Sequence, residues 1–245
     1  TDLKGKIPCH VLAVMEALSR AGHCGYLVGG SLRDLLRGVV PHDYDLTTDA
    51  TPEEMMAAFA DFRVIPTGLK HGTLTVLCDG ESVEVTTFRV DGEYTDHRHP
   101  DEVIFVTDVR EDLSRRDFTV NAMAYHPTLG LIDPFDGQSD LARRVLRCVG
   151  NPDERFAEDA LRILRCFRFA SVLGFAIDSA TDNAANALSH TLAVVSVERI
   201  TCEFLKLLCG QNATAVLMEH RNIIEVFLPE IRHLTDSATL SVVRP

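Results

Sequence analysis

The sequence has no apolar run of transmembrane length, no signal-peptide pattern and no pair of cysteines in C-x-x-C spacing. Without the first two features, we expect a soluble protein rather than one that spans a membrane. The seven cysteines are scattered and odd in number. This pattern argues against a disulfide framework or a zinc site and favours a reducing compartment such as the cytoplasm. The ten histidines show no metal-ligand spacing, and we find no internal repeat or low-complexity stretch.

What remains is an ordinary globular composition. The 245 residues are 46% hydrophobic and 24% charged, enough to bury a full core as one large domain or two small ones. A net charge of −12 argues weakly against nucleic acid as a partner. Residues 141–168, however, contain seven arginines against four acids. A basic stripe of this kind can guide RNA even on an acidic protein.

The most informative stretch is residues 26–45. A hydrophobic strand runs into Gly29 and Gly30, a helix follows, and the next strand carries Asp43 and Asp45. Paired glycines allow close approach of the backbone to a ligand, and a helix N-terminus suits phosphate. Carboxylates spaced i, i+2 on a strand face the same side and can hold a divalent cation together. A phosphate cradle beside a carboxylate pair indicates nucleotide chemistry, whereas the alternative is an ordinary strand-to-helix turn with surface acids.

Glu84 is a charged residue inside a β-branched strand, on the face opposite to Val83 and Val85. Taken alone, such a residue is more often exposed at an edge than a ligand. Beside Asp43 and Asp45 it becomes a candidate third carboxylate of a two-metal site.

Hydrophobic periodicity predicts alternating strands and helices in the first part of the chain. A helix start is expected at Thr51, a hairpin turn at Asp79 and Gly80, and a mobile polar loop over 91–101. After a break at 133–137 only helical patterns follow. The predicted helices are 10–21, 31–37 and 118–125, and the predicted strands are 26–28, 43–46, 73–77 and 82–88.

Residues 155–170 read as one helix with an apolar stripe. Glu158, Arg162 and Arg165 share another face, and Asp159 lies three residues before Arg162. From the pattern alone, these charges could form only a solvated i, i+4 salt bridge. The stripe is made by Phe156, Ala160, Ile163, Phe167 and Ala170.

Together these segments resemble a known family. Residues 29–38 (GGSLRDLLRG) with Asp43 and Asp45 resemble the nucleotidyltransferase signature of the DNA polymerase beta superfamily. The continuation resembles its class II tRNA nucleotidyltransferases (CCA-adding enzymes) and bacterial poly(A) polymerases. The further motifs, in the family's order, are 84–89 (EVTTFR), 115–122 (RRDFTVNA), 133–137 (DPFDG), 158–162 (EDALR) and 198–200 (ERI).

The resemblance implies an α+β fold and an order of domains. We expect a polymerase-beta-like head with a short mixed sheet over 1–138, an all-helical neck over 139–200, and the start of a helical body over 201–245. Relatives continue well past 228–231, so we expect this chain to be cut short. Catalysis should then survive, while tRNA affinity should suffer.

The resemblance also implies roles for individual residues. Two Mg²⁺ ions are expected on Asp43 and Asp45, helped by Glu84 as the third catalytic carboxylate. Asp117 is expected to read the ribose 2′-OH. Asp159 and Arg162 resemble a protein template that pairs with cytosine or adenine, because the acid accepts from an amine and the arginine donates to a ring nitrogen. The nucleotide-binding set is completed by Gly29, Gly30, Arg33, Arg116, Asn121 and Arg165.

The implied reaction is addition of CCA to the 3′ end of tRNA from CTP and ATP, with release of pyrophosphate. Residues 66–73 (PTGLKHGT) resemble the CCA-adding pattern, the basic stretch of poly(A) polymerases is absent, and the loop 89–101 has full length. Addition of A alone, to tRNA or as poly(A), stays an alternative. A silent nucleotide- or RNA-binding module is a third, and the intact carboxylates argue against it. Oligomeric state is not predictable.

Overall fold

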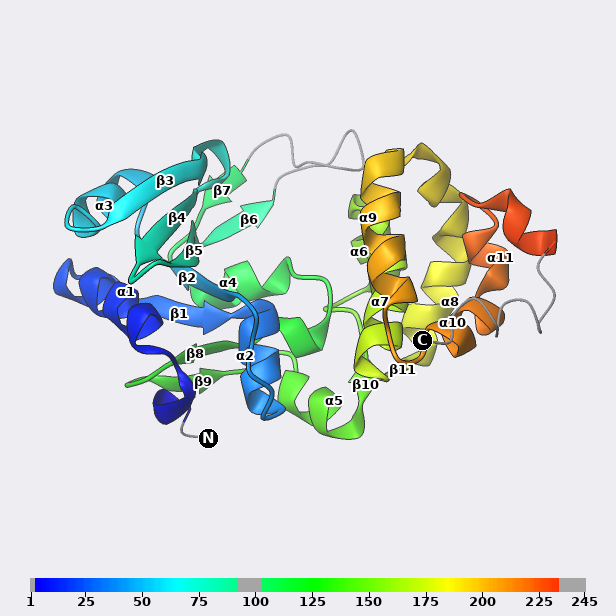
Figure 1. Ribbon diagram of the computed structural model, residues 1–245, viewed down its shortest axis with the longest axis horizontal. Coiled ribbons are helices and arrows are strands. Elements are labelled where there is room, and N and C mark those ends of the chain that lie inside the picture. Colours follow the sequence, from blue (N-terminus) through cyan, green and yellow to red (C-terminus); the bar gives the residue numbers. More distant parts are fainter. Residues whose placement is uncertain (1–2, 92–102, 234–245) are drawn as a thin grey trace. The chain divides into compact units, whose positions relative to one another are not determined.

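The computed structural model describes residues 3–91 and 103–233, which fall into two compact units (Figure 1). The described residues up to Leu141 form the first unit, and those from Ala142 onward form the second. The finer division into head, neck and body stays a prediction. The loop predicted over 91–101 lies outside the described residues, apart from Asp91 at its start.

The first unit alternates helices and strands, as the periodicity predicts. Its helices are η1 (Lys4–Lys6), α1 (Cys9–Arg20), α2 (Gly29–Leu36), α3 (Pro52–Ala58), η2 (Leu69–His71), α4 (Val109–Ser114), η3 (Thr119–Asn121) and α5 (Gly137–Arg143), the last of which crosses the boundary at Leu141. Its strands are β1 (Gly25–Val28), β2 (Tyr44–Thr48), β3 (Arg63–Gly68), β4 (Thr73–Cys78), β5 (Glu81–Thr87), β6 (Arg89–Asp91), β7 (Val103–Phe105), β8 (Ala124–His126) and β9 (Gly130–Ile132).

Seven of these strands form one mixed sheet in the order β3-β4-β5-β2-β1-β8-β9. Only β2 and β5 run parallel within it, and every other neighbouring pair is antiparallel. Strands β6 and β7 pair separately as an antiparallel ribbon. The mixed sheet predicted from the family resemblance is therefore present.

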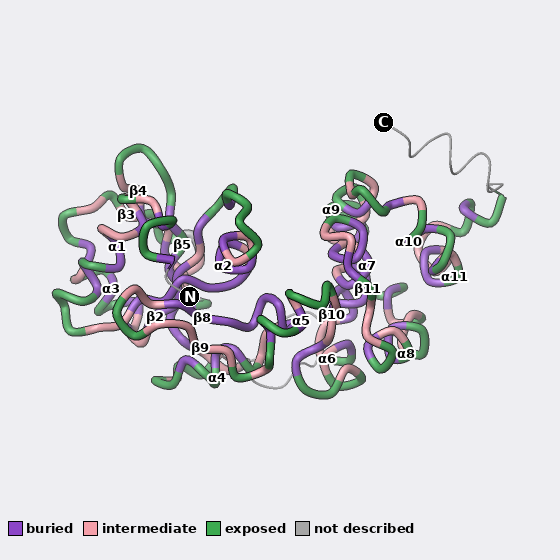
Figure 2. Tube along the Cα trace, turned by 90° about the horizontal axis from the view of Figure 1, so that it is seen from below, coloured by how far each residue is buried: buried purple, intermediate pink, exposed green. Residues whose placement is uncertain are grey.

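The two faces of the sheet have different neighbours. On one face, side chains of α1 and α3 pack with Leu46, Val83 and Val85 in the main core. On the other face, residues of α4 pack with Tyr26 and Val28 in a smaller cluster. Because side chains alternate along a strand, Asp45 and Glu84 must lie on this second face. Figure 2 shows the buried stretches in the interior of each unit and the exposed stretches at its turns.

Local signals account for several element ends. Thr51 and Glu54 form a reciprocal capping box at the start of α3, with Pro52 in its first turn. Asp79 and Gly80 both have positive φ, as a tight hairpin turn between β4 and β5 requires.

The predicted helix over 118–125 is wrong. A single 3₁₀ turn, η3, is followed by β8, which pairs with β1 inside the sheet. Phe118, Val120, Ala122 and Ala124 are all buried. A segment buried on every side carries no reliable period, and sheet pairing then decides its conformation.

The second unit is helical, as predicted, except for one short parallel pair of strands. Within the described range its elements are β10 (Val145–Leu146), α6 (Pro152–Glu158), α7 (Leu161–Leu173), β11 (Ala176–Ile177), α8 (Ser179–Leu188), η4 (Ser189–Val194), α9 (Val197–Leu208), α10 (Ala213–Glu219), α11 (Arg221–Ile224) and η5 (Pro229–His233).

The single helix predicted over 155–170 is also wrong in its continuity. Helix α6 ends at Glu158, Asp159 has extended backbone angles (φ −141°, ψ 104°), and α7 begins at Leu161. All five residues of the predicted apolar stripe are nevertheless buried. The stripe thus marks the core correctly although the chain bends within it.

None of the helices in the described part of the chain combines the length and apolar character that a membrane crossing requires. The seven cysteines are all free thiols.

Candidate active site

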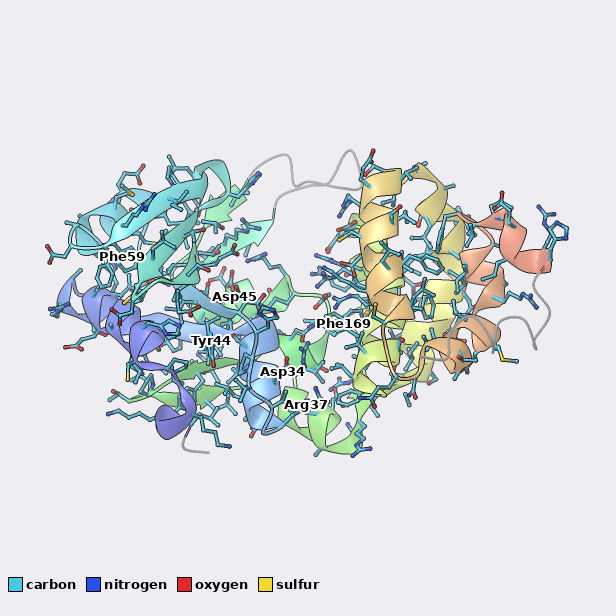
Figure 3. All side chains as sticks on the ribbon, in the orientation of Figure 1. Asp34, Arg37, Tyr44, Asp45, Phe59 and Phe169 are labelled. Carbon is cyan, nitrogen blue, oxygen red and sulfur yellow. The ribbon has the colours of Figure 1, made fainter. Side chains whose placement is uncertain are left out.

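The sheet register brings two predicted carboxylates directly opposite each other. Asp45 on β2 is paired with Glu84 on the parallel strand β5, and on its other side with Val28 at the end of β1. Asp43 lies one residue before β2 and is exposed. Asp45 therefore occupies the centre of a small acidic group, beside the strand end from which α2 starts (Figure 3).

The acidic group is electrostatically unfavourable in the protein alone. Burial, followed by repulsion from Asp43 and Glu84, raises the pKa of Asp45 to about 6. The Arg116 guanidinium opposes this shift but does not cancel it. A group of carboxylates that repel one another in this way is suited to a cation.

The donor set fits a magnesium site that is completed by substrate. Among the described residues, no group of three or more His, Cys, Asp and Glu side chains is arranged to hold a metal. Mg²⁺ commonly takes only one or two carboxylates and completes its shell with water and substrate phosphates. The pair Asp43 and Asp45 meets that requirement, and a ligand role for Glu84 stays a prediction.

The raised pKa leads to a prediction about stability. Asp45→Asn should be more stable than wild type above pH 6, by at most about 3 kcal/mol. The folded state of wild type holds the proton more tightly than the unfolded chain, so wild type loses stability as pH rises from about 4 to about 6. The asparagine removes this loss. Thermal melts in EDTA from pH 3.5 to 8 should show the two curves converging at low pH, and a variant less stable at pH 8 would contradict the assignment.

The N-terminus of α2 lies beside the acidic group. Gly29 has φ +68°, and a Cβ atom there would be 3.4 Å from Arg116 Nη1 and 3.8 Å from Asp45 Oδ2. Within the part of the chain that the structure describes, no side chain caps this helix end, so its first N–H groups are available to an anion. The helix begins at Gly29 rather than at the predicted Ser31, which places both glycines in its first turn.

The residues predicted to contact the ribose and the phosphates are linked to one another by side-chain hydrogen bonds. Arg33, on α2, is 7% exposed, and its Nη1 donates to Asn121 Oδ1 at 2.9 Å. Asn121 Nδ2 in turn donates to Asp117 Oδ1 at 3.2 Å. The same Asp117 oxygen accepts from the backbone N–H of Phe118 at 2.8 Å. Sequence reasoning named all three residues, and the fold brings them together through η3.

A buried acid that the sequence reasoning did not single out holds the arginines of the RRD motif. Asp112 on α4 is fully buried and accepts from Arg115 and Arg116. Burial by itself would raise the pKa of Asp112, but the guanidiniums of Arg116 and Arg115 outweigh it and hold the pKa below its usual value. The spacing i, i+3 and i, i+4 to these arginines was a signal in the sequence that could have revealed the pair.

The predicted base-reading residues lie in the second unit, but not on one helical face. Asp159 precedes α7, where its Oδ1 accepts from Leu161 N at 3.0 Å and its Oδ2 pairs with Arg199 at 2.8 Å. Arg162, on α7, pairs with Glu158 and donates to the carbonyl of Arg155 at 3.1 Å. The prediction of an i, i+3 helical pair is therefore wrong, because the chain bends at Asp159.

Arg165 and its neighbour one turn on are held by a second buried acid. Glu203 on α9 pairs with Arg165 at 3.8 Å and with Arg168 at 2.5 Å. The Arg168 guanidinium also stacks on the ring of Phe169, labelled in Figure 3, at 3.8 Å from its centroid. Arg165 and Arg168 thus lie beside the same buried acid, while 34% of the Arg165 side chain stays exposed.

Comparison with known proteins gives matches along most of the chain. Residues 25–147 match the family described as the poly A polymerase head domain. Residues 174–234 match a family described as a probable RNA and SrmB-binding site of polymerase A.

Individual relatives agree with these families. The CCA-adding enzyme of Oceanobacillus iheyensis is 48% identical over 217 residues, covering 89% of this chain and 53% of the relative. The crystal structure of the Bacillus stearothermophilus CCA-adding enzyme in complex with CTP superimposes with a TM-score of 0.77 at 44% identity, covering 85% of this chain and 50% of that one. A tRNA nucleotidyltransferase complexed with a primer tRNA and an incoming ATP analog gives 0.71 at 28% identity, covering 88% and 62%. The chain spans about half the length of the curated relatives it matches.

Proposed function

We propose that this chain adds CCA to the 3′ end of tRNA. The premise is that the chain belongs to the class II nucleotidyltransferase family with a poly A polymerase head domain. The substrates are CTP and ATP, and pyrophosphate is released. The observation that carries this proposal is the group of Asp43, Asp45 and Glu84 beside the N-terminus of α2. Free thiols throughout and the tRNA substrate favour a cytoplasmic location.

In this proposal the first unit performs the chemistry. Asp43 and Asp45 hold Mg²⁺, which when bound supplies the positive charge that offsets the triphosphate and favours attack by the 3′-OH. The N–H groups at Gly29 and Gly30 receive phosphate oxygens, with Arg33 alongside. Because these groups are held by the fold before substrate arrives, little reorganisation is needed on binding.

The second unit selects the base. Asp159 supplies an acceptor and Arg162 a donor, and Arg165 adds positive charge for the nucleotide. Support for an RNA partner comes from the match of residues 174–234 to a probable RNA-binding family. Support for CTP and ATP comes from the ligands of the related structures.

Incorporation measured with radiolabelled CTP and ATP separately, on tRNA lacking CCA and on tRNA ending in CC, tests this function. A CCA-adding enzyme incorporates label from CTP on the first substrate and from ATP on the second. Label from ATP alone would establish the A-adding alternative. If neither nucleotide is incorporated although nucleotide binding is measurable, the third alternative, a nucleotide- or RNA-binding module without catalytic activity, would be favoured.

The role of Asp117 gives a prediction about the sugar. If Asp117 accepts from the ribose 2′-OH, Asp117→Ala should lower the preference for ATP over dATP by about tenfold to hundredfold, the worth of a hydrogen bond to a charged acceptor. The measured quantity is the ratio of kcat/KM values, because a ratio is insensitive to partial loss of folded protein. An unchanged ratio would rule out this contact. Thr119→Ser, a neighbouring change outside the predicted contact, should leave the ratio as in wild type.

A further inference from the structure

Asp112 lies where three elements of the first unit meet. Its Oδ1 accepts from the backbone N–H of Arg89 at 3.3 Å and from Arg115 Nη2 at 2.7 Å. Its Oδ2 accepts from Arg116 Nη2 at 3.0 Å and lies 3.4 Å from the Thr47 hydroxyl. Asp112 is fully buried and accepts hydrogen bonds from β2, β6 and the end of α4. Such a complete set of donors indicates a specific role for this carboxylate.

Arg116 connects this carboxylate to the acidic group. Its Nη2 is bound by Asp112, and its Nη1 lies 3.4 Å from the Cβ position of Gly29. Its Nε is buried and has no hydrogen-bond partner among the described residues. The guanidinium therefore lies close to Asp45 without forming an ion pair with it in the part of the chain that the structure describes.

This separation needs an explanation, because Asp43, Asp45 and Glu84 together attract a neighbouring cation. An arginine that moved onto Asp45 would neutralise a ligand needed for Mg²⁺ and would take a donor away from the nucleotide. The only opposing attraction that the described residues provide for the Arg116 guanidinium is the ion pair with Asp112. Since Asp112 lies in a dry site and accepts with both oxygens, its pull on the arginine is little screened.

We propose that Asp112 is a positioning residue, which holds Arg116 beside the α2 N-terminus and away from Asp45. Its second oxygen fixes Arg115, whose Nε also donates to the carbonyl of Arg89 at 3.0 Å. The start of the β6-β7 ribbon and the guanidinium of Arg116 are thus both hydrogen-bonded to the Asp112 carboxylate. The inference rests on the proposed function in taking Arg116 as a nucleotide contact and Asp45 as a Mg²⁺ ligand.

A double-mutant cycle on nucleotide binding tests this role in the full chain. Asp112→Asn keeps the shape of the side chain but removes its charge. In the wild-type background, calorimetry with CTP and with ATP should show Kd raised by about tenfold to hundredfold. In an Arg116→Ala background, the same change should alter Kd by no more than about twofold. An equal loss in both backgrounds, or no loss in either, would overturn the proposal.

Asp140→Asn is the matched control, because Asp140 is also fully buried in the first unit and accepts from the Thr119 hydroxyl at 2.7 Å. It should lower the melting temperature and leave both Kd values unchanged. A comparable rise in Kd would show that loss of any buried acid suffices, against the proposal. If Asp112→Asn does not fold, Asp112→Glu keeps the charge but displaces it, and should raise Kd by a smaller factor that again vanishes without Arg116.

The same measurements separate this inference from the proposed function. A wild-type protein that binds nucleotide but transfers none would contradict the function and leave the role of Asp112 standing. A wild-type protein that transfers normally, with Asp112→Asn binding nucleotide as well as wild type does, would contradict the role of Asp112 alone.

Discussion

Asp45→Asn should reduce nucleotide transfer by roughly a thousandfold or more, for CTP and ATP alike. The change removes the charge of the central carboxylate and keeps its volume. Charge stabilisation at such a site is worth several kcal/mol, and each 1.4 kcal/mol corresponds to about tenfold in rate. Asp43→Asn should act in the same direction, because the two carboxylates share the cation in the proposed site. The measurement is single-turnover transfer to tRNA with each nucleotide.

The stability of Asp45→Asn distinguishes a catalytic role of Asp45 from a structural one. Asp45 is destabilising in the metal-free protein at neutral pH, so the asparagine variant should be at once inactive and at least as stable as wild type. Glu81→Gln is the matched control, because Glu81 is an exposed carboxylate on the same strand as Glu84. It should change neither property. Parallel loss of activity and melting temperature in Asp45→Asn would mark Asp45 as structural.

The face of the sheet on which Asp45 and Glu84 lie could be predicted from the sequence because it depends on local periodicity, whereas their pairing across β2 and β5 is a property of the fold. The alternation of side chains along β2 and β5 places Asp45 and Glu84 on the face away from the main core, whatever the rest of the fold. Turn and cap chemistry is equally local, which is why Thr51 and the pair Asp79 and Gly80 were predicted correctly.

The contacts of Arg168 and Arg199 depended on tertiary structure. Asp159 pairs with Arg199, forty residues later, and Arg168 pairs with Glu203 across two helices. No period within one element indicates such partners. The bend at Asp159 was missed for the same reason, since the apolar stripe continues through it and hides the end of α6.

The net charge alone is a weak guide to an RNA partner. An overall charge of −12 argued against an RNA partner. In each unit a buried acid pairs with two arginines. Asp112 pairs with Arg115 and Arg116, and Glu203 pairs with Arg165 and Arg168. Part of the negative charge thus lies on buried acids beside arginines, so the net charge alone does not describe how charge is distributed over each unit.

Base selection gives the second large effect expected of this protein. Cytosine and adenine each present an amine next to an unprotonated ring nitrogen, whereas uracil and guanine present a carbonyl next to a ring N–H. In the proposed function, an acceptor at Asp159 and a donor at Arg162 would satisfy the first pair of bases and would leave buried polar groups unpaired with the second. Each mismatch should cost about 1–3 kcal/mol, or roughly tenfold to hundredfold in kcat/KM.

The structure determines how the exchange of these residues must be made. Asp159→Arg would bring its guanidinium against Arg199, and Arg162→Asp would bring its carboxylate against Glu158. The exchange should therefore be built together with Arg199→Ala and Glu158→Gln, so that like charges do not decide the result. The variant with these two companion changes alone is the control, and it should keep the wild-type order of nucleotides even if its rate is lower.

With the exchange in place, preference should turn toward UTP and GTP, measured as kcat/KM for all four nucleotides on tRNA lacking CCA. Asp159→Ala alone should lower the use of CTP and ATP while UTP rises relative to them, because the acceptor that rejects a carbonyl is gone. The ratios matter more than the rates, since loss of the bond to Leu161 N also weakens the start of α7. If both variants keep the wild-type preference for CTP and ATP, the base is chosen elsewhere, and Glu158, Asp159 and Arg162 are only a set of salt bridges.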